Sequence, residues 1–121
     1  MLLFADTYAL VDFVKGNWNY ERYLVEHDII TTRLNLLELY YWAMTTESEE
    51  KAERCFNSFL PCAVEVEDEI LKKAAKFRQK HKKADISFID AIGYEIANAR
   101  KIKFLTGDGK FKELPNVEFV K

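Results

Sequence analysis

Two acidic residues follow predicted strands, where a carboxylate is well placed to act in catalysis. Asp6 comes after the apolar run at 2–5, and Asp108 follows the segment at 102–105. A continuous apolar run such as 2–5 is typical of a buried parallel strand. The functional crevice of a parallel sheet lies beyond the carboxyl ends of its strands, so we expect both residues at that edge. Glycines on either side of Asp108 would let its loop bend closely around whatever Asp108 contacts.

A third acid, Glu38, lies in the segment 34–42, Leu-Asn-Leu-Leu-Glu-Leu-Tyr-Tyr-Trp. A helix with this sequence is apolar nearly all round, which predicts that it is largely buried. A buried carboxylate needs a cation, a metal ion or a raised pKa. No Lys or Arg stands three or four residues from Glu38, so a metal ion is an attractive partner.

A fourth acid, Asp90, follows Ser87 at capping distance. If Ser87 is the N-cap of a helix, Asp90 is at the third helical position, close to the positive end of the helix dipole. The small residues Ala91 and Gly93 would let this helix approach a neighbour closely. Asp85 is an additional acid five residues earlier, which we expect either at the rim of the site or capping a turn.

The four acids favour a particular metal chemistry. Magnesium and manganese prefer oxygen ligands, whereas zinc favours Cys and His. Two such ions about 4 Å apart can activate water and stabilise the leaving oxygen when a phosphodiester is hydrolysed. Asp6, Glu38, Asp90 and Asp108 therefore predict a Mg²⁺ or Mn²⁺ site.

The elements that carry these acids alternate between short apolar runs and longer helical patterns. This alternation predicts an α/β fold: a parallel sheet of four to five strands with helices on both faces. The length of 121 residues suits one domain, 1–121. The strands are predicted at 2–5, 29–30, 63–66, 102–105 and 117–120. Helices are predicted at 7–16, 20–26, 32–44, 46–60, 67–80 and 87–100, with a helical turn at 110–114. The expected caps are Thr7 for the first of these helices, Thr31 or Thr32 for the third and Thr46 for the fourth.

Composition limits the kind of protein. The net charge is −2, whereas a protein that binds nucleic acid mainly through phosphates usually has a basic excess. Any nucleic-acid role therefore needs local cations or metal ions. No apolar stretch approaches the roughly 20 residues of a membrane helix, and the start lacks the basic region of a signal peptide. We expect a cytoplasmic protein without a membrane partner.

Four segments together resemble the motifs of PIN domains. Asp6-Thr7 after an apolar strand resembles the opening motif, and Leu-Leu-Glu-Leu at 36–39 resembles the second. The segment 87–94 resembles the third, and 106–111 resembles the fourth. Their order and spacing fit over essentially the whole chain, and the resemblance is greatest to the VapC-like toxins of toxin–antitoxin pairs.

The resemblance implies a function as well as a fold. PIN domains of this kind are Mg²⁺- or Mn²⁺-dependent endoribonucleases that cut RNA, often homodimers, held inactive by a small antitoxin protein. By matching position, the four acids named above would be the catalytic and metal-binding residues. Thr7 and Thr106 match positions where hydroxyls support them, and Asp85 is a departure from the pattern.

Other interpretations remain open. Three of the acids taken alone have simpler explanations: Asp90 as part of a helix cap, Asp6 as an N-cap or turn residue, and Asp108 as a turn residue. Glu38 is the hardest to explain in this way, because its helix has no polar face. An aspartyl-nucleophile phosphatase also has an Asp after its first strand, but its second Asp would fall at Tyr8, which argues against it. A PIN-like scaffold without activity, which binds protein or RNA, is the remaining alternative.

Two further features are ambiguous. The cations between 72 and 83 are typical of an exposed helix face, with a substrate-phosphate contact as the alternative. Aromatic residues cluster at 18–23 and 40–42. Most should be core, and some could line a groove for an antitoxin segment or for a second copy of the chain.

Overall fold

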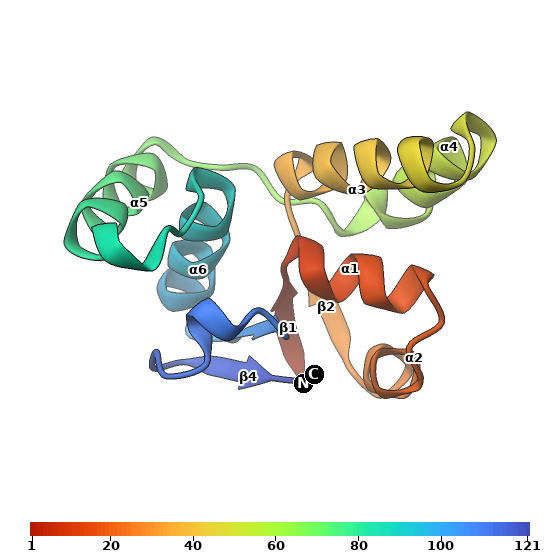
Figure 1. Ribbon diagram of the computed structural model, residues 1–121. Coiled ribbons are helices and arrows are strands. Elements are labelled where there is room, and N and C mark those ends of the chain that lie inside the picture. Colours follow the sequence, from red (N-terminus) through yellow and green to blue (C-terminus); the bar gives the residue numbers. More distant parts are fainter.

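The computed structural model describes residues 1–121 and has a four-stranded parallel sheet with helices packed on both faces (Figure 1). The strand order is β2-β1-β3-β4. The strands are β1 (Leu2–Ala5), β2 (Asp28–Ile30), β3 (Lys103–Thr106) and β4 (Val117–Phe119). The helices are α1 (Thr7–Val14), α2 (Trp18–Glu26), α3 (Arg33–Thr46), α4 (Glu49–Phe59), α5 (Asp68–Lys80) and α6 (Phe88–Arg100). Short 3-10 turns are η1 (Leu60–Cys62), η2 (Lys82–Ala84) and η3 (Gly109–Phe111).

The side chains of β1 point alternately into two layers of the hydrophobic core. Leu3 and Ala5 face the cluster built by α1, α2, α3 and α4, whereas Phe4 faces the cluster built by α5 and α6. Successive side chains of a strand point to opposite faces, so one buried strand can serve both layers. The two helical groups lie on opposite sides of the sheet (Figure 1), and the predicted α/β architecture is confirmed.

Helix α6 lies very close to the sheet, as its small residues predicted. A Cβ built on Gly93 would lie 2.6 Å from a ring atom of Phe4 and 3.1 Å from one of Phe104. Glycine is therefore required at this position for α6 to pack at its present depth. This packing fixes the start of α6, and hence Asp90, relative to the central strands.

The predicted strand at 63–66 is wrong. Only one residue pair, Thr31 and Ala63, forms a bridge, with the Val64 N–H donating to the Thr31 carbonyl at 2.8 Å. The chain then leaves the sheet, and Val64 and Val66 pack against the cluster around α6. The apolar–polar alternation at 63–66 therefore belongs to an extended connection that packs one side against the core and forms no ladder of strand hydrogen bonds.

Two helix starts also differ from the prediction. Helix α2 begins at Trp18 rather than Tyr20, because the Asn17 side chain accepts from the Asn19 N–H. Helix α4 is capped by Ser48, which accepts from the Lys51 N–H. Thr46 does not cap it: Thr46 still belongs to α3, where its hydroxyl donates to the Trp42 carbonyl at 2.7 Å.

Helix α3 is less buried than its composition predicted. Leu36 and Leu39 face the core, but Leu37, Tyr41 and Met44 are exposed at 59%, 64% and 41%. These three residues follow helical spacing, so they form one apolar stripe on the outer surface of α3. The expectation that this helix is largely buried is therefore wrong for its outer face.

The order of the strands creates a switch point at the centre of the sheet. The chain moves from β1 to β2 on one side, then returns through α3–α6 to place β3 on the other side of β1. Ligand crevices in parallel sheets lie where the strand order reverses in this way. The carboxyl ends of β1 and β3 flank that point, and they lead directly into Asp6 and Asp108.

Candidate active site

Asp6 is the most buried acid of the chain, at 2% exposure. It is the N-cap of α1, where its Oδ1 accepts from the Ala9 N–H at 3.0 Å and its Oδ2 accepts from the Thr106 hydroxyl at 2.6 Å. The sequence predicted Thr7 as this cap, which is wrong, because Thr7 is already the first residue of the helix.

The pKa of Asp6 is raised from 3.8 to about 8. Burial is the largest cause, because it removes water from the charged form. The hydrogen bonds from Thr106 and Ala9 oppose the rise, while the nearby charges of Asp90 and Asp108 add to it. The protein thus places a carboxylate where, without a positive partner, its charged form is unfavourable.

Thr106 connects the ends of β1 and β3. Its hydroxyl donates to Asp6 and accepts from the Asp108 N–H at 3.0 Å, so one buried oxygen orients both acids. Asp108 then caps η3 by accepting from the Lys110 N–H at 3.0 Å. Gly107, between them, has no room for a Cβ, which would meet the Tyr8 ring and the Val120 carbonyl.

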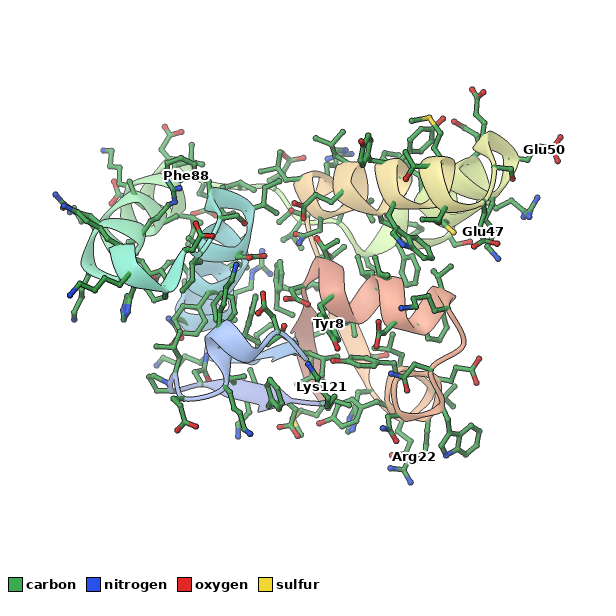
Figure 2. The ribbon with its side chains drawn as sticks, in the orientation of Figure 1. Tyr8, Arg22, Glu47, Glu50, Phe88 and Lys121 are labelled. Carbon is green, nitrogen blue, oxygen red and sulfur yellow. The ribbon has the colours of Figure 1, made fainter.

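The glycines around Asp108 therefore differ from the expectation. Gly107 is required by close packing against α1 and the chain end, whereas Gly109 has open space around it. Figure 2 shows Tyr8 beside Lys121, whose Nζ lies 5.5 Å from the ring centroid. Tyr8 stands where the phosphatase interpretation needs a second acid, so that interpretation lacks its acid.

Glu38 is hydrogen-bonded to Thr7, the residue that follows Asp6 and begins α1. Its Oε1 accepts from the Thr7 hydroxyl at 2.5 Å, and Thr7 in turn accepts from the Asn35 amide at 3.1 Å. The Asn35 carbonyl oxygen accepts from the Thr32 hydroxyl at 2.6 Å. A polar chain from the start of α3 to α1 therefore holds Glu38 in place, although Glu38 itself is only partly buried.

Asn35 is a site residue that sequence reasoning missed. Its side chain is fully buried, and it supports Thr7 from one turn before Glu38 on the same helix. A buried amide with partners on two elements rigidifies its surroundings. The sequence did contain a signal, because Asn35 is a polar residue three positions before Glu38, on the same helix face, in an otherwise apolar segment.

Asp90 occupies the third position of α6, as predicted, and its N–H donates to the Ser87 hydroxyl at 3.1 Å. Its pKa is raised to about 6, mainly by burial and further by the charges of Glu38 and Asp108. The Ser87 side chain and the Lys110 ammonium oppose this rise. Lys110 was missed by sequence reasoning.

Asp85 does not join the other acids through its side chain. It adopts a left-handed backbone conformation, φ 54° and ψ 44°, that ends η2, and its side chain is exposed. Its carbonyl accepts from the Lys110 Nζ at 3.0 Å. That bond joins the connection before α6 to the turn that carries Asp108, so Asp85 acts through its backbone at the rim.

The four predicted acids therefore share one electrostatic environment. Asp6 is affected by Asp90 and Asp108, and Asp90 is affected by Glu38 and Asp108. None of them takes part in the ion pairs of the chain, which join Arg33 to Glu65, Lys72 to Glu69, and Lys103 to Glu118. No three acidic, His or Cys side chains are close enough to form a ready metal-binding group.

The oxygen atoms of these four carboxylates are suitable ligands for a hard divalent cation, although no three of the side chains converge on one point. Carboxylate oxygens are the ligands that Mg²⁺ and Mn²⁺ prefer. Mg²⁺ commonly takes one or two carboxylates and keeps several waters, so it does not require three converging acids. A cation is also what the unpaired acids require electrostatically.

A match to the PIN domain covers residues 3–117, so the chain belongs to the PIN-domain family. No curated protein sequence is similar enough to count as a match. The family predicted from the four motifs is confirmed, and the fold arrangement described above agrees with it. None of the helices is long and apolar enough to cross a membrane.

Similar solved structures come from toxin–antitoxin systems. VapC20 of Mycobacterium tuberculosis, described as a sarcin–ricin loop cleaving toxin, is similar with a TM-score of 0.83 and 17% identity, covering 96% of this chain and 97% of that one. A toxin–antitoxin complex from Klebsiella pneumoniae has a TM-score of 0.77 and 20% identity, covering 98% of this chain and 96% of that one. DNA-bound VapBC from Salmonella typhimurium has a TM-score of 0.76 and 17% identity, covering 99% of this chain and 98% of that one. At these identities the likeness shows a shared fold.

Proposed function

We propose that this chain is a Mg²⁺- or Mn²⁺-dependent endoribonuclease, the toxin of a toxin–antitoxin pair. The observation that carries the proposal is the Asp6 carboxyl, fully enclosed beside further acids with no cation in contact. Such an arrangement is costly for folding alone, and active sites are where such costs are retained. PIN-family membership gives the arrangement its reaction class.

Asp6, Glu38, Asp90 and Asp108 would hold the ion or ions. When bound, the metal would supply Lewis-acid activation of water and charge stabilisation at the phosphate. Thr106 orients Asp6 and Asp108, and Thr7 orients Glu38 through hydrogen bonds already in place. One of the carboxylates would accept the proton of the attacking water. The water oxygen would bond to phosphorus in line with the leaving oxygen, whose bond to phosphorus breaks, without a covalent enzyme intermediate.

The partners follow from the same proposal. The substrate is RNA, the protein acts in the cytoplasm, and a small antitoxin blocks it. The exposed stripe of Leu37, Tyr41 and Met44 on α3 supports a protein partner or a homodimer, because an apolar stripe of this kind is typical of an interface. The similar solved structures include toxin–antitoxin complexes.

A labelled mixed RNA pool tests the activity. We expect cleavage by the wild type in Mn²⁺ or Mg²⁺, no cleavage in EDTA, and at least a hundredfold loss for Asp6→Asn. Asp68→Asn, the same change at an exposed position at the start of α5, is the control and should cleave normally. Full activity of Asp6→Asn would refute the proposed site.

The alternative is a PIN-like module that binds protein or RNA without cleaving it. One observation favours it: no three of the acids form a ready metal-binding group. It predicts a folded wild type that binds its partner and cleaves no RNA with either metal.

A further inference from the structure

Seven cations lie on α5 and the turn that follows it: Lys72, Lys73, Lys76, Arg78, Lys80, Lys82 and Lys83, with no acid in the chain between 70 and 84. They occupy more than one face, because Lys73, Lys76 and Lys80 line one pocket with Tyr94, while Arg78 and Lys82 line another with Phe88. Only Lys72 is engaged in an ion pair, with Glu69 at 3.5 Å. The net charge of −2 therefore hides a local basic surface, which attracts polyanions.

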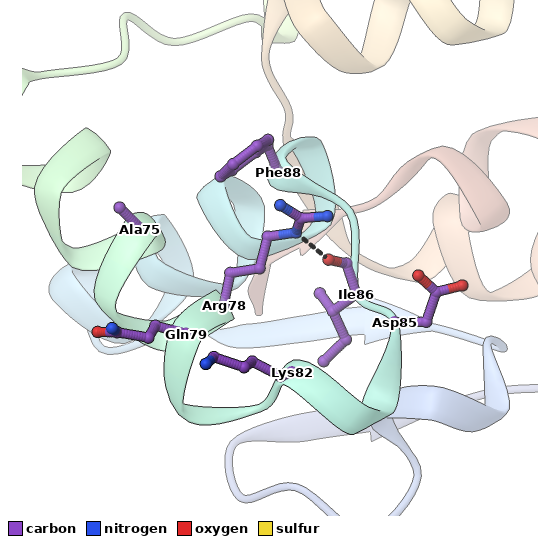
Figure 3. A pocket seen from close by; sticks show the side chains of 7 residues that line it. All are labelled: Ala75, Arg78, Gln79, Lys82, Asp85, Ile86 and Phe88. Carbon is purple, nitrogen blue, oxygen red and sulfur yellow. Dashed lines mark hydrogen bonds between the residues drawn. The ribbon is translucent and has the colours of Figure 1, made fainter.

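The pocket with Phe88 has a volume of about 380 Å³ and lies between α5 and the start of α6 (Figure 3). Arg78, Gln79 and Lys82 line it from the side of α5 and η2, and Phe88 lines it from α6. Asp85, whose carbonyl bonds Lys110 at the rim of the acidic site, also lines this pocket (Figure 3). Two cations, an amide, an aromatic ring and one carboxylate thus border a space large enough for a nucleobase and its phosphate.

Arg78 and Phe88 form a stacked pair at the mouth of this pocket. The guanidinium carbon lies 4.1 Å from the centroid of the Phe88 ring, and Arg78 Nε donates to the Ile86 carbonyl at 2.9 Å (Figure 3). The Nη groups of Arg78 are left to donate elsewhere. Phe88 nevertheless stays 55% exposed, although burying its ring would stabilise the fold.

The pocket and the acids lie on two sides of the same helix start. Phe88 and Asp90 are two residues apart on α6, which separates them by about 200° around the helix axis. Phe88 reaches outward at the start of α6 next to α5 (Figure 2), whereas Asp90 is influenced by Glu38 and Asp108 on the opposite side. A polymer crossing the start of α6 would contact both.

We propose that this pocket binds single-stranded RNA, with a nucleobase stacked on Phe88 and the adjacent phosphate held by Arg78 and Lys82. The inference rests on the proposed nuclease function and defines how its substrate is held. Alternating bases and phosphates match an aromatic ring flanked by cations, because stacking is tolerant of sequence and the cations neutralise the backbone. Gln79 adds a group that can bond a base edge.

Fluorescence anisotropy of a labelled, short single-stranded RNA pool in EDTA tests binding without cleavage. Phe88→Ala should weaken binding about tenfold, the effect of losing one stacked base. Phe88→Trp should keep wild-type affinity, since its ring also stacks. Trp18→Ala, which removes a comparably exposed aromatic from α2, is the matched control and should leave affinity unchanged.

The charge contribution is measured separately. Lys82→Ala should weaken binding about threefold and lower the slope of log K against log salt by about 0.7, the value for one phosphate of a single strand. Poly-glutamate, which carries charge without bases, should compete poorly with RNA. Equal competition by poly-glutamate would overturn the assignment in favour of an acidic protein partner.

The outcomes separate this inference from the proposed function. Unchanged affinity and cleavage in Phe88→Ala would overturn the pocket while leaving the nuclease intact. Phe88-dependent binding by a wild type that cleaves no RNA under either metal would keep the pocket and overturn the nuclease. Because the ring is exposed, Phe88→Ala should fold normally, and its unfolding temperature checks this directly.

Discussion

Replacing Asp6 by Asn should remove a pH dependence from the stability of the metal-free protein. The folded-state pKa of Asp6 is about 8, above the ordinary value of 3.8. Between these values the folded protein binds a proton at Asp6 that the unfolded chain has released. The free energy of unfolding therefore falls as pH rises through this interval, and the stabilising contribution is fully present only below 3.8.

The size of the effect follows from the same interval. At 1.36 kcal/mol per pH unit for one proton, raising the pH from 5.5 to 8.0 should cost the wild type about 3 kcal/mol at Asp6. Relaxation of the site lowers this figure, so about 1 kcal/mol is the smallest loss that supports the reasoning. Asp6→Asn cannot ionise here and should not show this loss.

Urea unfolding of both proteins in EDTA at the two pH values gives the difference directly. Other titrating groups are present in both, so they largely cancel. Adding Mn²⁺ at pH 8.0 should then restore the stability of the wild type, by about 2.7 kcal/mol when the ion is a hundredfold above its Kd, and should leave Asp6→Asn unchanged. Equal pH dependence of the two proteins would show that Asp6 is not held protonated, and the reasoning would be refuted.

Three further variants probe the framework around the acids. Thr106→Val leaves two buried polar groups without their shared partner and should lower the free energy of unfolding by about 2 kcal/mol in urea titrations; no loss would contradict the bridging role. Asn35→Ala frees the Thr7 hydroxyl and should reduce kcat of RNA cleavage about tenfold with an unchanged affinity for RNA; a change confined to affinity would contradict a positioning role. Gly93→Ala introduces a Cβ 2.6 Å from a ring of the sheet and should cost about 2 kcal/mol by calorimetry, while Gly109→Ala, in open space, should be nearly neutral; similar effects of the two would contradict the packing argument.

The positions of Asp6 and Asp108 could be predicted because each depends on local and general features. A short apolar run followed by an acid indicates a strand and its carboxyl end, and parallel strands bring those ends to one edge. Asp90 was predictable for a similar reason, since Ser87 fixes the start of α6. The segment 63–66 failed because an extended connection with one packed side has the same alternation as a strand.

The support of the site could not be predicted in the same way. Thr7 lies on α1 and Asn35 on α3, with α2 and β2 between them in the chain, so their hydrogen bond depends on packing that no local pattern encodes. Lys110 reaches the carbonyl of Asp85 over a distance of 25 residues in sequence. Four acids in a motif therefore identify a site, whereas the polar side chains that orient them become visible only in the fold.

The net charge was the feature that argued most against a nucleic-acid role, and its distribution reverses that argument. Glu38, Asp90 and Asp108 bring negative charge to the switch point, which would repel RNA until cations neutralise it, whereas Asp6 is held protonated without a metal ion. Arg78 and Lys82 border the pocket on the Phe88 side of the start of α6, and neither takes part in an ion pair. A strand of RNA attracted to α5 would thus be presented to acids that act on it only with metal bound.

Affinity for RNA should accordingly survive EDTA and depend on α5, while cleavage should depend on the acids. Loss of binding in EDTA, with Lys82→Ala and Phe88→Ala both without effect, would show instead that the metal site alone attracts the substrate.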